Sequence, residues 1–238
     1  NYIVRNVLTG DSTEDISEYN WFSGYRFKGK VYGLDWRTND VMSLDLTNGA
    51  KAMIALPDYD RVKSSYFYDG YAVIGFYDFD TERNTIWLVD LENEIADSIL
   101  SFSEPRNGDG AFEINDCVIG KNSAGDLVLS YTRCRENTGK NEELVMYNLT
   151  KRNEIFSKSG GHFGKLLSGN GFIKYDLYGL NGWSELYGLE LRSLDNGAVT
   201  FSNTEDVIGP PTVYVRGDIV FYQNLNSYSK IDGKTGQV

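Results

Sequence analysis

Residues 65–102 read SYFYDGYAVIGFYDFDTERNTIWLVDLENEIADSILSF, and this stretch decides the fold class. Its apolar and polar residues alternate in runs of five to eight, which is the pattern of half-buried β-strands. Turn residues separate the runs, beginning with Asp69-Gly70 after the first one. The stretch therefore predicts four short antiparallel strands that follow one another along the chain.

The same unit recurs along the sequence, with four further copies at 25–56, 112–158, 166–202 and 212–238. The glycines of the first turn, Gly29, Gly70, Gly125, Gly171 and Gly217, lie 41, 55, 46 and 46 residues apart. A repeat of this period is typical of solenoids and β-propellers. No segment needs helical spacing to explain its apolar residues.

The two ends of the chain complement each other in this scheme. The last copy lacks its fourth strand, and the apolar run at residues 2–9 belongs to no complete copy. Pairing the first and last segments would close a ring and remove its free edges. We therefore predict an all-β fold, a single β-propeller domain over residues 1–238 with five four-stranded blades closed by the N-terminal strand. The expected blades cover approximately 21–62, 63–105, 111–160, 165–205, and 212–238 together with 1–10. A fragment of a six- or seven-bladed propeller is the main alternative, and a β-sandwich is another.

Three segments carry a resemblance to known repeat families. GKVYGLDWRTNDVMSLDL (29–46) resembles YWTD-type repeats, YFYDGYAVIGFYDFDTERNTIWLVDL (66–91) resembles TolB-type repeats, and GDIVFYQNLNSYSKIDGKTGQ (217–237) resembles quinoprotein-like repeats. Each copy departs from each family's consensus. The resemblance therefore implies the propeller architecture and no particular family function.

Composition excludes several classes of protein. The formal net charge of −11 would repel a phosphate backbone, so we expect no nucleic-acid partner. The chain has no run of about 20 apolar residues, so membrane insertion is not expected. One histidine and two cysteines exclude a four-ligand Cys/His zinc site. The acidic composition favours a secreted or cell-surface protein, and nothing indicates an oligomeric state.

The two cysteines flank a hairpin-like stretch. A tight turn at Gly125-Asp126 would place Cys117 opposite Cys134, which permits a cross-strand disulfide. The alternative is two buried thiols that act as small apolar side chains.

Binding residues are expected on one end of the propeller, which we call the loop face. It carries the loops between second and third strands and the connections between blades. Its aromatic and arginine residues are candidate ligand-binding residues: Trp36, Arg37, Tyr59, Arg133, Arg135, Tyr178 and Trp183. The alternative is that the aromatics cap blade interfaces and that the arginines pair with surface acids. We expect no role for the loop histidine, His162.

Alternating acids mark a candidate cation site in one loop. Asp78, Asp80, Glu82 and Asn84 offer the oxygen ligands that Ca²⁺ prefers, although the spacing is not that of an EF-hand. The alternative is a solvated acidic turn. No cofactor other than Ca²⁺ is indicated.

The sequence favours a non-catalytic binding domain for a protein or glycan ligand on the loop face. One alternative is a lectin-like sugar binder with a shallow site on each blade. The other is a glycoside hydrolase, which needs two carboxylates about 5–9.5 Å apart. Its candidate acids lie on or near expected inner strands: Asp35, Asp78, Glu113, Asp116 and Asp176. We assign no catalytic residue.

Overall fold

The computed structural model describes residues 3–5, 12–15, 24–35, 37–57, 61–103, 112–135, 141–161, 163–178, 186–203, 212–223 and 228–238. These residues form β-strands and their turns, and none of them lies in a helix that could cross a membrane. The prediction of an all-β propeller with five successive blades is confirmed.

Each blade is an antiparallel sheet whose strands are ordered as in the chain. The first blade contains β3 (Tyr25–Phe27), β4 (Lys30–Leu34), β5 (Val41–Asp45) and β6 (Lys51–Ile54). The second contains β7 (Arg61–Tyr68), β8 (Tyr71–Asp78), β9 (Arg83–Asp90) and β10 (Ile95–Ser103). The third contains β11 (Phe112–Lys121), β12 (Leu127–Arg135), β13 (Asn141–Asn148) and β14 (Asn153–Ser159). The fourth contains β15 (Leu167–Gly169), β16 (Phe172–Tyr178), β17 (Leu186–Ser193) and β18 (Val199–Asn203). The fifth contains β19 (Thr212–Arg216), β20 (Ile219–Gln223) and β21 (Tyr228–Asp232).

Tight turns set the strand pairing, as the Asp69-Gly70 turn illustrates. Asp69 and Gly70 have φ angles of 44° and 83°, and Tyr68 pairs with Tyr71 across them. Two successive positive φ angles give a turn whose twist matches that of the flanking strands. The turn therefore fixes the register of β7 on β8, and with it the face to which each side chain points.

The core consists of the apolar layers between neighbouring blades. Leu34 and Val41 of the first blade pack with Ile74 and Phe76 of the second. Corresponding clusters join the second blade to the third, the third to the fourth, and the fourth to the fifth. Burial of these faces is the main favourable contribution to stacking the blades in sequence.

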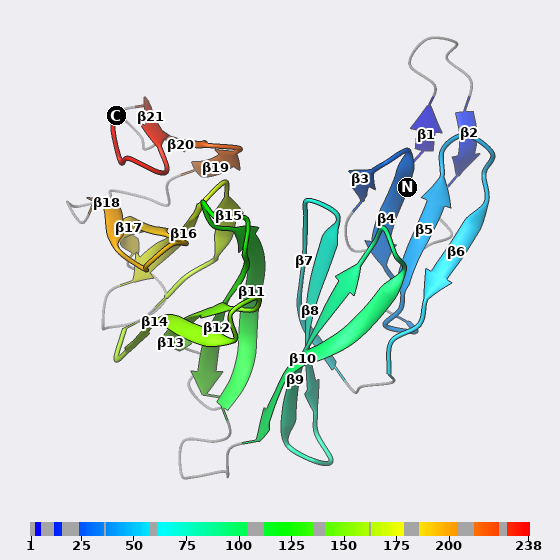
Figure 1. Cartoon of the computed structure of the whole chain (residues 1–238), viewed down its shortest axis with the longest axis horizontal. Coiled ribbons are helices and arrows are strands. Elements are labelled where there is room, and N and C mark those ends of the chain that lie inside the picture. The colour runs from blue at the N-terminus through cyan, green and yellow to red at the C-terminus, as the bar shows by residue number, and fades with distance from the viewer. Residues whose placement is uncertain are drawn as a thin grey trace.

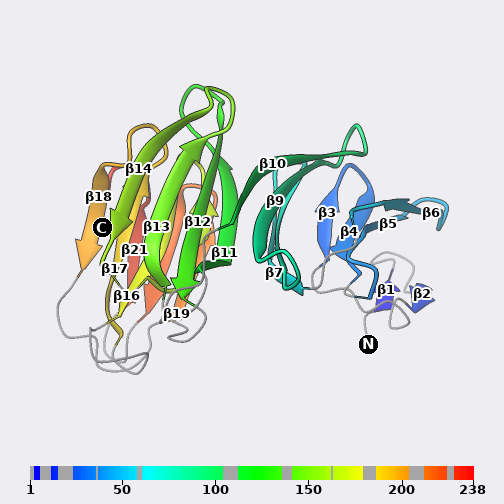
Figure 2. The same cartoon turned by 90° about the horizontal axis from the view of Figure 1, so that it is seen from below.

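The first strands of the blades face one another. β11 contacts both β7 and β15, and β15 contacts β19. The Tyr66 hydroxyl of β7 donates to the Ser168 carbonyl of β15 at 3.1 Å, which links the second blade directly to the fourth. Figures 1 and 2 show the blades following one another along an arc, from the first blade to the fifth.

Among the described residues the fifth blade has three strands, and the N-terminal strand does not join them as predicted. β1 (Ile3–Arg5) pairs with β2 (Ser12–Asp15) in a separate two-stranded sheet, instead of adding a fourth strand beside β21. This hairpin lies next to the first blade, whereas β21 lies at the far end of the arc (Figure 1). Pairing with a segment a few residues away costs less chain entropy than pairing across the whole molecule, which explains the local hairpin.

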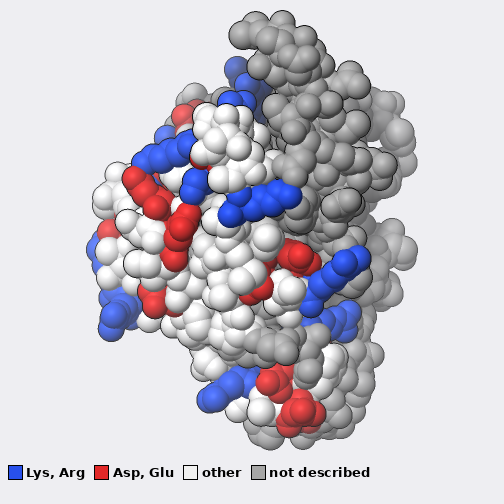
Figure 3. All heavy atoms as spheres, turned by 90° about the vertical axis from the view of Figure 1, so that its right-hand side faces the viewer, with Lys and Arg blue, Asp and Glu red and all other residues white. Residues whose placement is uncertain are grey.

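Charged side chains of both signs share the surface. Figure 3 shows one side of the molecule, on whose described part Lys, Arg, Asp and Glu are interspersed. Several of them form pairs, such as Lys30 Nζ with Glu94 Oε1 at 2.9 Å and Lys121 Nζ with Asp69 Oδ2 at 2.6 Å.

Candidate functional site

The predicted binding residues are spread over several blades. Trp36, Tyr59 and Trp183, together with His162, lie outside the described residues. Arg37 follows the first blade's β4 and is exposed, and Arg135 is the last residue of β12. Tyr178 ends β16, where it is half-buried against Gly164, and burial raises its pKa.

Arg133 is the predicted binding residue that lines a pocket. This pocket, which we call the blade-3 pocket, has a volume of about 390 Å³. It lies at the loop face and is lined by Phe112, Arg133, Glu142, Glu143 and the segment 159–161. The side chains come from three adjacent strands, β11, β12 and β13, and the short segment begins at Ser159, the last residue of β14.

Arg133 is fixed in place from two sides. Its guanidinium pairs with the Glu143 carboxylate, and both side chains are about four-fifths buried. The guanidinium carbon also lies 5.5 Å from the Phe102 ring centre and 5.1 Å from that of Phe112. An arginine held between aromatic rings and a carboxylate loses little further entropy on binding. The arrangement therefore holds the Arg133 side chain in one position.

Two consecutive glycines, Gly160 and Gly161, form one wall of the blade-3 pocket. Gly160 has a φ angle of 75°, and its amide donates to the Glu142 carbonyl at 3.0 Å. A Cβ on Gly161 would lie 2.5 Å from the Phe163 ring, so a side chain there would clash. This wall therefore requires glycine at both positions, for the left-handed backbone at Gly160 and for the close approach of Phe163 at Gly161.

The predicted calcium ligands have different roles in the structure. Asp78 Oδ1 accepts a hydrogen bond from the Thr81 amide at 2.8 Å, and the hydrogen bonds from Thr81 lower the pKa of Asp78. Asn84 is fully buried and binds the start of β11: its amide nitrogen donates to the Phe112 carbonyl at 2.7 Å, and its amide oxygen accepts from the Ile114 amide at 2.9 Å. Within the described ranges, no three His, Cys, Asp or Glu residues gather closely enough to hold a metal ion. The calcium site predicted at Asp78, Asp80, Glu82 and Asn84 stays a prediction.

Two β-bulges reshape the inner strands where the second and third blades meet. Lys63 is the unpaired residue of a bulge in β7, and Asn115 is the unpaired residue of a bulge in β11. A bulge re-aims the side chains on its strand. Here Lys63 pairs with Glu113 of β11, and both side chains are nearly buried.

Asp116 is the most perturbed carboxyl group of the inner strands. Its Oδ2 accepts from the Leu166 amide at 2.7 Å, and its Oδ1 accepts from the Ser64 hydroxyl at 3.3 Å. Burial raises the pKa of Asp116 to about 6, against these hydrogen bonds and the nearby Lys165, which lower it. Asp116 therefore joins segments of three blades.

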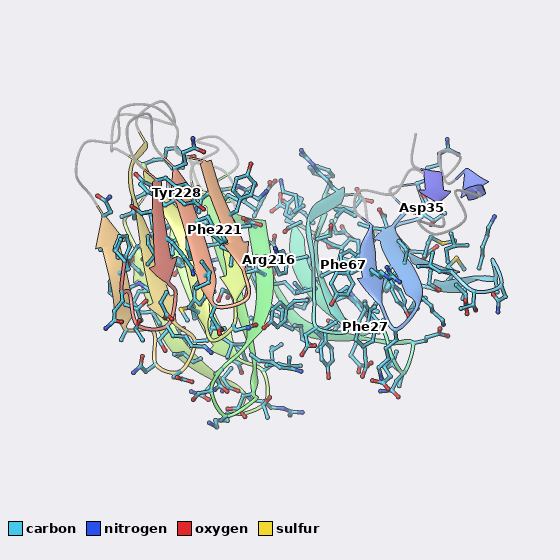
Figure 4. All side chains as sticks on the ribbon, turned by 90° about the horizontal axis from the view of Figure 1, so that it is seen from above. Phe27, Asp35, Phe67, Arg216, Phe221 and Tyr228 are labelled. Atoms are coloured by element: carbon cyan, nitrogen blue, oxygen red, sulfur yellow. The ribbon has the colours of Figure 1, made fainter. Side chains whose placement is uncertain are left out.

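The remaining candidate acids also have internal partners. Asp176 pairs with Lys174, whose pKa is lowered by burial. Asp35 accepts from the Arg37 amide at 2.9 Å in the turn after β4, a position labelled in Figure 4. These contacts give each acid a local structural role.

The predicted disulfide does not form in this structure. Both cysteines are buried free thiols, and Cys117 lies opposite Tyr131 while Cys134 lies opposite Glu113. The turn is longer than predicted, because the Asn122 amide donates to the Asp126 carbonyl around it. This turn shifts the register at Cys117 by three residues, and the bulge at Asn115 adds one more at Cys134, which separates the two thiols. Burial raises the pKa of Cys117 to about 12.

Sequence reasoning missed several residues that the structure makes prominent. Lys63 and Ser64 bind inner-strand carboxylates, but a bulge leaves no signal in a single sequence. Phe79 lies in a loop of the loop face with 45 % of its surface exposed, and its ring stands edge-on to Tyr77 at 5.2 Å. The position of Phe79 between Asp78 and Asp80 of the acidic loop could have identified it as a candidate ligand-binding residue.

Comparison with known proteins identifies the architecture and no family. No family model and no curated protein sequence matches the chain. Among solved structures, it is similar to the computationally designed Ika8 protein, with a TM-score of 0.62 and 12% identity over 99% of this chain and 66% of that one. It is also similar to BamB from Moraxella catarrhalis, with a TM-score of 0.54 and 14% identity over 99% and 68% of the two chains. A third match is KlHsv2 with loop 6CD replaced by a Gly-Ser linker, with a TM-score of 0.59 and 9% identity over 96% and 71%. The chain thus spans about two thirds of the length of these structures, and the likeness confirms the propeller fold.

Proposed function

We propose that this propeller is a non-catalytic binding domain that docks a protein ligand on its loop face. The observation that carries the proposal is the blade-3 pocket, where Arg133 is held between Phe102, Phe112 and Glu143. Arginine and aromatic residues in partly desolvated pockets are typical anchors of protein interfaces.

Charge indicates which ligand group the pocket favours. Its lining carries Glu142 and Glu143 against the single cation of Arg133, and the chain as a whole has a formal net charge of −11. An acidic pocket in an acidic protein attracts a cation and repels an anion. We therefore propose that the bound segment presents a lysine or arginine side chain next to Glu142.

The inner-strand acids support binding over hydrolysis. Glu113 and Asp176 are paired with lysines, and Asp116 accepts hydrogen bonds from two neighbouring segments. Carboxylates engaged in this way stabilise the packing of the blades, so we do not propose the glycoside hydrolase. A secreted or cell-surface location remains part of the proposal on compositional grounds alone.

A peptide array tests the proposal. The native chain is incubated with an array of random peptides at low and at physiological salt, and the binding peptides are read for Lys and Arg. We expect enrichment of basic peptides, with at least fivefold weaker binding for Glu142→Gln. Glu154→Gln, on the exposed outer strand β14, is the matched control and should bind as the native chain does. Absence of basic enrichment, or equal binding by Glu142→Gln, would refute the proposal.

A further inference from the structure

A second pocket lies at the opposite end of the strands, where turns from four blades converge. We call it the turn pocket; its volume is about 530 Å³. Its walls include Tyr68 from the second blade, Lys121 and Ser123 from the third, Asn170 and Asp195 from the fourth, and Lys234 beyond β21. The volume is within the range of sites that hold small molecules.

Hydrogen bonds between blades hold the walls of the turn pocket. The Tyr68 hydroxyl donates to Asn170 Oδ1 at 2.9 Å, and the Ser123 amide donates to Asp195 Oδ1 at 2.8 Å. The backbone amide of Asn170 donates to the Gly217 carbonyl at 3.0 Å, and this bond connects the fifth blade to the pocket wall. These contacts join segments far apart in the sequence, so the pocket is preformed by the packing of the blades.

The same side chains have further hydrogen-bonding capacity. An asparagine offers two N–H donors besides its oxygen, a carboxylate has two oxygens, and a lysine has three donors. In the turn pocket, Asn170 and Asp195 each accept a hydrogen bond through Oδ1. The side-chain nitrogen of Asn170, Nδ2, and the second carboxylate oxygen of Asp195, Oδ2, are left for a ligand. The walls therefore offer both donors and acceptors.

The charges of the turn pocket balance. Lys121 and Lys234 are matched by Asp69 and Asp195 in the lining, and Lys121 is bound to Asp69 at 2.6 Å. Lys234 in turn pairs with Asp218 at 3.0 Å. A pocket built for phosphate would carry unbalanced positive charge, whereas balanced donors and acceptors suit a neutral ligand with many hydroxyl groups.

We infer that the turn pocket binds a neutral mono- or disaccharide. The half-buried Tyr68 ring supplies an aromatic surface for a sugar ring, and Asn170 and Asp195 supply hydrogen bonds to its hydroxyl groups. The site lies at the opposite end of the strands from the blade-3 pocket, so it does not depend on the proposed protein ligand. It also differs from a repeated lectin site, because one pocket is shared by four blades.

Calorimetric titration of the whole chain tests this inference. The probes are a panel of neutral mono- and disaccharides, with inorganic phosphate and glucose 6-phosphate as charged probes. We expect at least one neutral saccharide to bind with a Kd of about 1 mM or tighter, and both phosphates to bind at least tenfold more weakly. Asn170→Ala should weaken saccharide binding at least tenfold.

Two further variants keep the test decisive. Ser123→Trp fills the pocket while leaving the Ser123 amide hydrogen bond in place, so it should abolish binding even where Asn170→Ala fails to fold. Asp97→Ala, at an exposed position on β10, is the matched control and should bind like the native chain. The inference is overturned if no saccharide binds at 50 mM, if a phosphate binds more tightly, or if Ser123→Trp binds normally.

Discussion

The junction between the second and third blades differs sharply from the fifth blade. At the junction, side chains of one blade bind the backbone of the next: Asn84 holds the start of β11, and the Cys117 amide donates to the Ser64 hydroxyl at 2.9 Å. In the part of the fifth blade that the structure describes there are three strands of five residues each, and apolar contacts with the fourth blade cover one of its faces.

The other face of the fifth blade is open. Tyr214 and Tyr228 are 65 % and 64 % exposed, and the ring centre of Phe221 lies 6.2 Å from that of Tyr228 with the two rings tilted by 31°. Figure 4 shows Arg216, Phe221 and Tyr228 together on this blade, away from Phe27 and Phe67 on the first and second blades. The fifth blade is thus held by apolar stacking on one face and by hydrogen bonds from the fourth blade to the Gly217 and Gly233 carbonyls, whereas buried side-chain bonds to backbone fix the centre of the arc. Four measurements test this contrast.

Replacing Asn84 should have the largest effect on stability. Asn84→Ala leaves the Phe112 carbonyl and the Ile114 amide without their buried partner. Each unsatisfied group costs about 1–3 kcal/mol, so we expect a loss of about 2–4 kcal/mol in the free energy of unfolding, measured by urea denaturation. Asn93→Ala, in an exposed turn, is the control and should cost about 1 kcal/mol or less. A loss below 1 kcal/mol for Asn84→Ala would show that the polar bonds do not fix the junction.

Asp116 gives the junction a distinctive dependence on pH. Its pKa is raised from 3.8 to about 6 in the folded protein. Between about pH 4 and pH 6 the folded protein therefore keeps a proton that the unfolded chain has released, and this contribution to stability is lost as pH rises. The stability of the native chain relative to Asp116→Asn should fall by about 1–3 kcal/mol from pH 4 to pH 7.

The control for Asp116 is an exposed carboxylate. Urea denaturation of the native chain, Asp116→Asn and Asp97→Asn at half-unit pH steps provides the comparison. Asp97→Asn should follow the native profile over this window, because its side chain is exposed on β10. Parallel profiles for the native chain and Asp116→Asn would contradict a raised pKa at this site.

Local sequence pattern predicts most of this architecture. The alternation in 65–102 gives the four strands of the second blade, and Asp69-Gly70 gives their turn, because both signals involve neighbouring residues. Long-range features escaped prediction. The sequence predicts residues 2–9 as the closing strand because the last repeat lacks its fourth strand. In the structure, β1 pairs instead with β2, a segment only a few residues away.

Register and site chemistry were also only partly predictable. The bulge at Asn115 and the turn at 122–126 shift β11 against β12, which separates Cys117 from Cys134. Residue type and loop position are enough to predict Arg133 as a candidate. Its contacts with Phe102, Phe112 and Glu143 depend on packing between blades, which the sequence pattern does not reveal. The turn pocket was not predicted, because its walls come from turns of four different blades.

Hydrogen exchange should order the blades by stability. β12 and β20 are both central strands with a neighbour on each side, so their amides have equivalent hydrogen bonds. The third blade packs against the second blade on one face and the fourth blade on the other. We therefore expect the amides of Val128–Ser130 to exchange at least tenfold more slowly than those of Val220–Tyr222. A tenfold difference corresponds to about 1.4 kcal/mol in opening free energy. Equal protection of the two strands would show that the open face does not weaken the fifth blade.

The smallest effect should come from the open face itself. Tyr214→Thr replaces an exposed side chain with one that also favours strands, so we expect a change within about 0.5 kcal/mol in the free energy of unfolding. Tyr222 lies in the same sheet on the opposite, buried face, and Tyr222→Thr should cost about 3 kcal/mol or more because it leaves a cavity against the fourth blade. Both variants are measured by urea denaturation at two protein concentrations. A large or concentration-dependent loss in Tyr214→Thr would mean that this face is covered in solution, and the contrast between the fifth blade and the junction would then disappear.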